Sequence, residues 1–457
     1  MHDRSQLASL LRCPACGGGV PARAGDAWQC PACATRFPEF DGIPWLFAAP
    51  DAALAEWRQR LHALLADLAR EAVGLRAALE RPALGVAARN RLKLQAAALE
   101  DHARRLVALL APIGAEQGMA TPEMYRALGT RIPGAQGLAS YYVNLHRDWV
   151  WGAEENAAGL AALVAALGSA APRRVLVLGA GAGRLVYDLQ QRLRPALMVA
   201  LDINPLYAFV ARRIFDGERV SLYEFPIAPR DAESHAILRM LAAERPLDGG
   251  VEFVLADASH APFAPGSFDA VITPWLIDII DEDLASFAPR VNALLEPGGR
   301  WVNTGSLAFA QADPALRYTL EEVVDLVATS GFARPETSEQ RIPYMCSPAS
   351  RHGRVEAVVT FTAIKQCEAA PPTPHEQLPE WLVRTDLPVP ALAAFQSDAL
   401  TMRIYGYLAT LIDGRNSIAE MARVVVSERL MTADAAEAAI LGFVRRLYED
   451  SRRRVHY

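Results

Sequence analysis

The sequence of 457 residues lacks several features that define common protein classes. Arg, Asp or Glu interrupts each apolar stretch well before the roughly 18 residues that a membrane span requires, so we expect no membrane partner. The opening MHDRSQLASLLRCPAC has no long apolar segment like that of a secretory signal, which predicts a cytoplasmic protein. A net charge of −6 argues against nucleic-acid binding by the whole chain, although one domain could still be basic.

Cysteine is also scarce, but four of the six cysteines form two Cys-Pro-Ala-Cys pairs near the N-terminus. Thirteen residues separate Cys13 and Cys16 from Cys30 and Cys33. Each pair can present two thiolates to one tetrahedral zinc ion. Without a secretory signal, paired cysteines indicate a metal more often than disulfides, which are the alternative. Four thiolates leave no open position on zinc, so we predict a structural ion.

Hydrophobic periodicity predicts helices after this segment. Residues 51–112 are rich in Ala, Leu, Arg and Glu, with apolar residues at three- and four-residue spacing. This pattern favours two amphipathic helices that break near Arg81 and Pro82. Nothing in the two helices suggests chemistry, and we expect His62 and His102 to lie on their surface.

Strands alternate with helices from about residue 120 to residue 365, which predicts a parallel sheet covered on both faces. The run at 355–365 is predicted as a late strand, with an antiparallel orientation at the end of the sheet as one option. A proline-rich linker follows at 369–379. Beyond it, Ser417 and Glu420 fit a capping box within a small helical module, for which we predict a winged-helix-like fold.

A glycine-rich turn joins the first strand of this region to a helix, in the sequence RVLVLGAGAGRL. Gly179, Gly181 and Gly183 let backbone N–H groups and a helix N-terminus approach a ligand closely. Arg184 stands where the NAD fingerprint requires its third glycine, and no Gly-Lys-Ser/Thr follows as in a P-loop. The pattern alone is weak, because a glycine-rich turn with no ligand is the alternative.

Acidic residues follow the next two predicted strands. Asp202 can accept hydrogen bonds from both ribose hydroxyls of an adenosine, and Asp257 can accept one from the adenine amino group. Thr273 lies near the end of the fourth strand and completes our predicted cofactor set, and the sequence LEPGG precedes the fifth strand. This ordered set resembles class I S-adenosylmethionine-dependent methyltransferases. The resemblance implies a Rossmann-like sheet of seven strands with S-adenosylmethionine as cofactor.

The sequence CATRFPEFDGIPWLF, which follows the last of the paired cysteines, resembles small zinc ribbons found beside or fused to bacterial methyltransferases. Further segments, SYYVNLHRDWVWGAEEN, PWLIDIIDED and WVNTGSLAFA, resemble the carnosine N-methyltransferase family over about residues 138 to 365. The resemblance implies that Asn144 and Arg147 approach the methionine end of the cofactor. It also implies that Asp278 holds the substrate nitrogen. From the residues alone, Arg147 in a surface ion pair and Asp278 as one of several surface acids are the alternatives.

The chain departs from that family where Ser306 replaces a proline and Ala310 replaces a histidine that contacts the substrate imidazole. This indicates an acceptor that differs from carnosine. His146 and His260 flank the cofactor segments, and each is a candidate base. Further aromatic residues are candidates for the walls of the acceptor pocket, with core packing as the alternative: Tyr141, Tyr142, Trp275 and Tyr344.

We therefore predict an α/β methyltransferase that transfers a methyl group to nitrogen on an imidazole- or amine-bearing small molecule or peptide. The alternative is a recognition or scaffold protein with a degenerate core, which binds a protein, peptide or nucleic acid through its end modules. The predicted parts are a zinc ribbon (1–50), a helical segment (51–137), the methyltransferase domain (138–368) and the winged-helix-like module (380–457).

Overall fold

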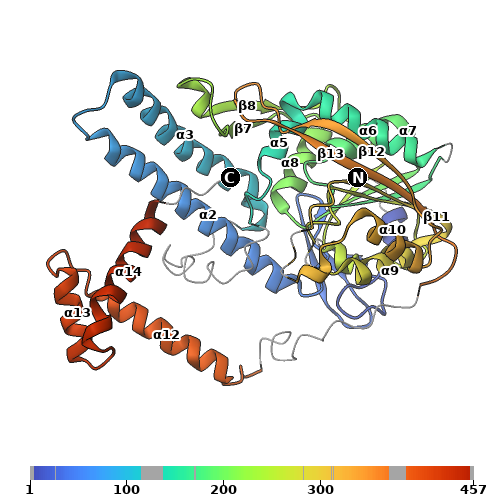
Figure 1. Ribbon diagram of the computed structural model, residues 1–457. Helices are drawn as coiled ribbons and strands as arrows, with labels where there is room; N and C mark the ends of the chain where they lie inside the picture. The colour runs from blue at the N-terminus through green and yellow to red at the C-terminus, as the bar shows by residue number, and fades with distance from the viewer. Residues whose placement is uncertain are drawn as a thin grey trace. The chain divides into compact units, whose positions relative to one another are not determined.

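The computed structural model in Figure 1 divides into two compact units, residues 1–375 and residues 376–456. We describe each unit by itself. Among the described residues, no helix combines the length and the apolar character needed to cross a membrane. The structure describes residues 5–25, 27–114, 137–168, 171–280, 282–309, 311, 313–369 and 387–452.

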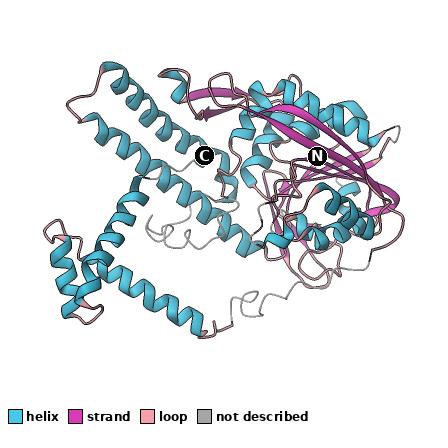
Figure 2. Ribbon diagram, viewed as in Figure 1, coloured by secondary structure: helices cyan, strands magenta, loops and turns pink. Residues whose placement is uncertain are grey.

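A mixed sheet of seven strands forms the centre of the first unit (Figure 2). In chain order the strands are β5 (Arg174–Leu178), β6 (Leu197–Asp202), β9 (Val251–Leu255), β10 (Phe268–Pro274), β11 (Leu295–Gly305), β12 (Glu336–Tyr344) and β13 (Arg354–Ile364). Their order across the sheet is β12–β13–β11–β10–β5–β6–β9, with β13 antiparallel to both of its neighbours. The predicted seven-stranded Rossmann-like sheet is confirmed. The late strand, β13, is antiparallel, which the sequence left as one option. It does not end the sheet, because β12 pairs with its outer side.

Both faces of the sheet are buried, as the alternating residues of β5 demonstrate. Val175 and Val177 belong to one hydrophobic core, and Leu176 and Leu178 belong to the other. Continuous apolar strands of this kind are typical of sheets covered on both sides. Helices α6 (Ala153–Leu167), α7 (Arg184–Leu193) and α8 (Pro205–Phe215) cover the first face, and α9 (Leu284–Leu294) and α10 (Leu320–Thr329) cover the second.

The N-terminal segment packs directly on the edge of this sheet at β9. Its elements are α1 (Ser5–Leu10), β1 (Ala22–Ala24), β2 (Ala27–Gln29), β3 (Arg36–Phe40) and β4 (Ile43–Pro44). The Leu46 amide donates a hydrogen bond to the Leu255 carbonyl of β9 (2.8 Å), and the Ala264 amide donates to the Leu10 carbonyl (2.8 Å). The segment therefore covers an edge that would otherwise present unpaired backbone groups.

Two long helices follow, α2 (Pro50–Leu79) and α3 (Val86–Leu110), which run side by side as a hairpin in Figure 1. Both helices and the break between them agree with the sequence prediction. The expectation that His102 lies on the surface is wrong, because only 4% of this residue is exposed. It lies on the side of α3 that packs against the hairpin of β7 (Val220–Glu224) and β8 (Ile237–Leu241), which the sequence analysis did not predict.

Short elements complete the first unit. The most important for the site is α5 (Val143–His146), which continues into η2 (Arg147–Trp151), a π-helical turn. Such turns occur mostly as single bulges and are frequent at functional sites. The others are the 3₁₀ turns η1 (Ala111–Ile113), η3 (Glu233–His235), η4 (Ala258–His260) and η5 (Pro314–Leu316).

The second unit contains α12 (Ala393–Thr410), α13 (Ile418–Ser427) and α14 (Ala433–Arg452). The predicted capping box is present, with Ser417 and Glu420 each bonded to the other's backbone amide at the start of α13. Within residues 387–452 the structure has helices and no strand. The helical character of the module is thus confirmed, and these residues contribute no β-wing.

Candidate functional site

A cavity of about 550 Å³ opens at the carboxyl ends of β5, β6 and β10. Ligands of open α/β sheets bind at this edge, outside the ends of the parallel strands. Many separate parts of the first unit line the cavity, among them α5 with η2, the glycine turn, the ends of β6 and β9, the segment after β10, and the hairpin of β12 and β13. Most of the predicted site residues meet here.

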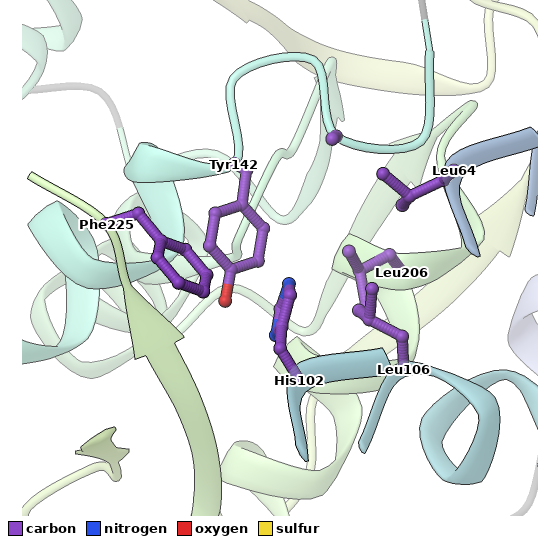
Figure 3. Close-up of a pocket in the computed structure, with 7 residues that line it drawn as sticks. Leu64, His102, Leu106, Tyr142, Leu206 and Phe225 are labelled. Atoms are coloured by element: carbon purple, nitrogen blue, oxygen red, sulfur yellow. The ribbon is translucent and has the colours of Figure 1, made fainter. Parts of the chain in front are cut away.

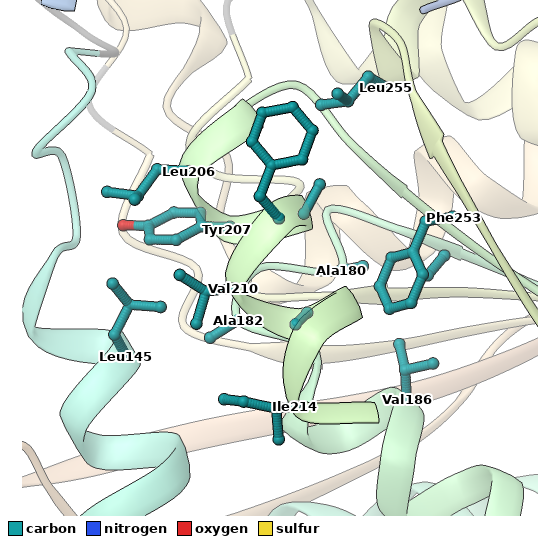
Figure 4. Close-up of a cluster of buried hydrophobic side chains, with 14 of the residues drawn as sticks. Leu145, Ala180, Ala182, Val186, Leu206, Tyr207, Val210, Ile214, Phe253 and Leu255 are labelled. Atoms are coloured by element: carbon teal, nitrogen blue, oxygen red, sulfur yellow. The ribbon is translucent and has the colours of Figure 1, made fainter. Parts of the chain in front are cut away.

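The glycine turn needs its glycines for two different reasons. Gly179, Gly181 and Gly183 all have positive φ (+71°, +55° and +82°), a region that residues with a Cβ rarely adopt. A Cβ on Gly181 would meet nothing within 4 Å, so this backbone is open to a ligand in the cavity. A Cβ on Gly183 would lie 2.8 Å from the Ala211 Cβ, so this glycine allows α7 to pack against α8 and does not line the cavity. Figure 4 shows the packed side chains behind the turn, among them Ala180, Ala182, Val186, Val210 and Ile214.

Asp202 and Asp257 line the cavity at the ends of β6 and β9, as predicted. The Gly181 amide donates to Asp202 Oδ2 (2.7 Å), so this carboxylate also fixes the glycine turn. Burial raises the pKa of Asp202 against the lowering effect of the backbone donors. Burial also acts to raise the pKa of Asp257, but hydrogen bonds from His260 and from the Ser259 amide outweigh it and lower the pKa. Asp257 is therefore held as a carboxylate.

Arg147 lines the cavity from η2, where it is ion-paired with two carboxylates. Its Nε lies 2.7 Å from Asp148 Oδ1, and its Nη1 lies 3.1 Å from Glu155 Oε1. Burial acts to lower the pKa of Arg147, but these two carboxylates raise it above its usual value. The alternative of a surface ion pair does not hold, because the Arg147 side chain is only 12% exposed.

Asn144 precedes Arg147 by one helical turn and lines the same cavity. Its side-chain oxygen Oδ1 is buried and has no hydrogen-bond partner among the residues that the structure describes. This oxygen has almost no accessible surface, so other atoms of Asn144 line the cavity.

Asp278 follows β10 and lines the other end of the cavity. Its Oδ2 accepts hydrogen bonds from Ser306 Oγ (2.6 Å) and from the Ala308 amide (3.0 Å). Burial raises the pKa of Asp278, and these two donors lower it in part. With 4% of the residue exposed, Asp278 is not the surface acid that the sequence left open.

Three of the four predicted aromatic residues line the cavity near Asp278, namely Tyr141, Trp275 and Tyr344. The ring centroids of Trp275 and Tyr344 are 4.8 Å apart. Trp275 has a positive φ of +52°, which is uncommon for a bulky residue and is typical of strained positions at functional sites.

Other predicted residues lie elsewhere. Thr273 is fully buried in β10, where it bonds to Asn303 and accepts from Trp301 Nε1 (2.9 Å), so the structure does not bring it to the cavity. Tyr142 directly precedes α5 and His146 ends it, and the side chains of both bond to the Tyr223 carbonyl of β7 instead of lining the cavity. Figure 3 shows Tyr142 with His102 and Phe225 around a separate small cavity.

His260 is exposed and pairs with Asp257, which does not suit the predicted role of a base. Ala310, which replaces the family histidine, lies outside the described residues.

The sequence analysis missed several residues that line the cavity. Glu155 of α6 and Arg354 of β13 are two charged examples, and Arg354 lies 4.6 Å from the Tyr344 ring centroid. Glu155 stands in the same segment as Asn144 and Arg147 but was given no role, and Arg354 reaches the cavity only through the order of the strands. Helix α2 also contributes Glu56 and Arg60, although its sequence suggested no chemistry.

The four paired cysteines lie together in the N-terminal segment, with their sulfur atoms all within 4.8 Å of one another. Two of the Sγ–Sγ distances, Cys13 to Cys33 and Cys16 to Cys30, are 3.7 Å. This is close to the edge of about 3.8 Å expected for a tetrahedron with Zn–S bonds of about 2.3 Å. The sulfur geometry and the all-thiol donor set both fit a structural zinc ion.

Comparison with known proteins matches the central part of the chain. A family model described as a methyltransferase domain matches residues 176–302, which contain the glycine turn and strands β6 to β10. Together with the strand order, this match identifies the class I S-adenosylmethionine-dependent methyltransferase fold. No curated protein matches the chain.

Solved methyltransferase structures are similar to about half of the chain. Phosphoethanolamine N-methyltransferase 2 of Haemonchus contortus, in complex with phosphomonomethylethanolamine and S-adenosylhomocysteine, is 15% identical with a TM-score of 0.34. The match covers 52% of this chain and 61% of that enzyme, so this chain spans about three fifths of its length. A possible histamine N-methyltransferase of Thermotoga maritima is 17% identical, with 50% and 98% of the two chains covered and a TM-score of 0.30. The 1,6-didemethyltoxoflavin N1-methyltransferase of Burkholderia thailandensis is 21% identical, with 55% and 93% covered and a TM-score of 0.30.

Proposed function

We propose that this protein is an S-adenosylmethionine-dependent methyltransferase that methylates nitrogen on an amine- or imidazole-bearing small molecule or peptide. One observation carries the proposal. A single cavity brings together the open backbone at Gly181, the carboxylates Asp202 and Asp257, and a separate polar and aromatic end around Asp278. The first group suits an adenosine, and the second leaves room for an acceptor.

The residues present suit each part of the cofactor. Asp202 would accept from the ribose hydroxyls and Asp257 from the adenine amino group. Arg147 would hold the carboxylate of the amino-acid end, because a guanidinium matches the geometry of a carboxylate. When bound, S-adenosylmethionine supplies an electrophilic methyl group on a sulfonium.

The task of the acceptor end is to align a nucleophile with that methyl group for an in-line displacement. Ser306 and the Ala308 amide fix Asp278 through Oδ2, which leaves Oδ1 for the acceptor. We assign Asp278 the role of orienting the acceptor nitrogen and stabilising the positive charge that develops on it. A carboxylate whose pKa burial raises can also take the proton that the nitrogen releases.

The charge around this end supports an amine as acceptor. Asp278 and Glu356 contribute two carboxylates, and Arg354, which is paired with Glu356 (2.6 Å), contributes one guanidinium. The resulting excess of negative charge and the nearby rings of Trp275 and Tyr344 favour a cationic group.

We also propose that the cysteine cluster binds one structural zinc ion. Four thiolates fill its coordination sphere, so the ion takes no part in the transfer. Its role would be to hold the N-terminal segment against the edge of the sheet at β9.

The first experiment is a calorimetric titration of the purified protein with S-adenosylmethionine, S-adenosylhomocysteine and NAD. We expect the two sulfur ligands to bind and NAD not to bind. A panel of amines, imidazoles and short peptides would then be incubated with S-adenosylmethionine and analysed by mass spectrometry for a gain of one methyl group. Failure of both sulfur ligands would refute the proposed cofactor. Binding without methylation of any acceptor would favour the recognition protein.

A further inference from the structure

Helix α6 has a gap in the face that it packs against the sheet. The buried residues of the helix are Glu155, Leu163 and Leu167. Gly159 completes their four-residue spacing, so it belongs to the same stripe of the helix. Apart from its own helix, no described atom lies within 4 Å of the place that a Cβ on Gly159 would take. This glycine therefore does not serve a close approach of α6 to the sheet, and it lines the cavity instead.

The strands that α6 covers extend the cavity in one direction. Tyr344 and Ile342 line it from β12, and Arg354 and Val358 line it from β13. Alternate residues of a strand share a face, so each pair lies on one side of the sheet. Because the strands are antiparallel and Tyr344 pairs with Arg354, Ile342 and Val358 both lie farther from the turn that joins the strands. We call this extension of the acceptor end, lined by Gly159, Ile342 and Val358, the side branch.

The lining of the side branch suits an apolar ligand. Ile342 and Val358 are only 4% and 1% exposed, yet they belong to neither of the two hydrophobic cores beside the sheet. The polar residues that also line this part are bonded to the protein. Thr304 Oγ1 bonds to Thr360 Oγ1 (3.0 Å), and Asn156 Nδ2 donates to a backbone carbonyl (3.2 Å). An apolar group needs no partner and fits such a lining.

A hydrogen bond between β12 and α6 limits the length of the side branch. Gln340 Nε2 donates to the carbonyl of Ala158, which directly precedes Gly159 (3.4 Å). A glycine within a helix and a gap in a packed interface both lower the stability of the free protein. A bound apolar group would fill the space and offset the second of these costs.

We infer that the side branch binds a short aliphatic arm of the methyl acceptor, while the acceptor nitrogen lies at Asp278. This inference rests on the proposed function and narrows the acceptor to an amine that carries such an arm. Leucine occupies the next two positions of the stripe, so the arm that fits has about four carbons, the size of the missing side chain. The charged amino-acid end of the cofactor would find no partner at Ile342 and Val358, so it is not the occupant.

The test measures how straight-chain primary amines, from ethylamine to hexylamine, bind to protein that is saturated with S-adenosylhomocysteine. We expect the affinity of the wild-type protein to rise about three- to fourfold with each added methylene until the side branch is filled, because each methylene leaves water. Ligand-observed NMR would measure the amine affinities, and calorimetry would measure the affinity for S-adenosylhomocysteine.

Gly159→Leu fills the gap with the side chain that the stripe carries at its next two positions. This variant should abolish the gain in affinity with chain length and leave the affinity for S-adenosylhomocysteine within about twofold of the wild-type value. Its melting temperature should not fall, because leucine favours a helix more than glycine does. Gly74→Leu is the matched control, because Gly74 is an open helix glycine of α2 that does not line the cavity. It should keep the full dependence on chain length.

Three results would overturn the inference. The first is a wild-type protein that binds no amine, or binds all of them equally, and the second is a Gly159→Leu variant that keeps the dependence on chain length. The third is a loss of affinity for S-adenosylhomocysteine in that variant, which would assign the space to the cofactor. A wild-type protein that does not bind S-adenosylhomocysteine would instead refute the proposed cofactor, so the two failures are distinguishable.

Discussion

The two ends of the cavity are built in different ways. At the cofactor end, Gly181 and Asp202 come from consecutive strand ends and are joined by a hydrogen bond (2.7 Å), whereas Arg147 and Asp257 come from other elements. At the acceptor end, Asp278, Tyr344 and Ser306 come from elements that only the sheet order brings together. The first end therefore contains a core that adjacent sequence motifs specify, whereas the second depends wholly on the order of elements in the sheet.

This difference explains how well each end could be predicted. The glycine turn and the acids after β6 and β9 each follow a predicted strand in the expected order, and the structure brings them to one cavity. Glu155 lies in the segment SYYVNLHRDWVWGAEEN, but the resemblance gave a role only to Asn144 and Arg147, and Arg354 lies near no motif. Their position at the cavity became apparent only from the contacts of Glu155 with Arg147 and of Arg354 with Tyr344.

The largest expected effect comes from removal of the proposed zinc ion. This experiment tests whether the cofactor end depends on the N-terminal segment as well as on the glycine turn and Asp202. Elemental analysis should find about one zinc ion per chain. Chelation should lower the melting temperature markedly, because zinc binding supplies about 10 kcal/mol or more in small zinc domains. It should also weaken S-adenosylhomocysteine binding, because Leu10 bonds to the Ala264 amide in the segment that follows Asp257. A metal-free protein with unchanged melting and binding would contradict both the zinc site and this dependence.

The next effect sharpens the comparison at the acceptor end. Asp278→Asn should lower turnover about 100-fold or more, which is the range for loss of an acid–base group. The affinity for the cofactor should stay within about twofold of the wild-type value. Calorimetry and initial rates with any acceptor found in the panel would measure the two effects. Asp325→Asn is a suitable control, because that side chain is 67% exposed on α10. Full activity in Asp278→Asn would remove the proposed role.

A smaller effect is expected at the cofactor end. Asp202→Asn should weaken S-adenosylhomocysteine binding by about tenfold, because it removes a charge that faces the ribose. This loss contrasts with the unchanged affinity for S-adenosylhomocysteine expected for Gly159→Leu. Asp216→Asn, at the exposed end of α8, should leave the affinity unchanged. An unchanged affinity in Asp202→Asn would refute the ribose assignment.

A last effect, on stability and not on binding, concerns the support behind the cofactor end. Burial lowers the pKa of His102 to about 3 and that of His146 to about 4, with Arg105 and Arg239 as nearby cations that contribute. Because these pKa values lie below the unfolded value of about 6.5, the two histidines contribute stability above that pH and lose it on acidification. From pH 7 to pH 5 we expect a loss of about 2 kcal/mol per histidine in the free energy of unfolding.

Urea unfolding across this pH range would measure the loss. His102→Leu should reduce the pH dependence by about half, whatever its effect on stability at pH 7. A wild-type protein whose unfolding free energy is constant between pH 7 and pH 5 would contradict the burial of both histidines.

Two expectations were wrong for reasons of packing. His102 looked like a surface residue because an amphipathic pattern assigns polar residues to the outer face of a helix, yet the hairpin of β7 and β8 covers that part of α3. Thr273 was assigned to the cofactor by its place at the strand end. Its side chain instead bonds inside the core to Asn303 and Trp301. A position at a strand end does not by itself distinguish a side chain that faces the cofactor from one that faces the core.

The two edges of the sheet are protected by different means. The edge strand β12 carries Glu339, Arg341 and Pro343, and charged residues and proline discourage pairing with another chain. The opposite edge strand, β9, is apolar, and it depends on the N-terminal segment to cover it. If the four cysteines hold the proposed zinc ion, a chain without it is expected to expose this strand, apolar apart from Glu252, to pairing with other copies of itself. Metal supply in the producing cell should decide how much of the protein stays free of aggregates.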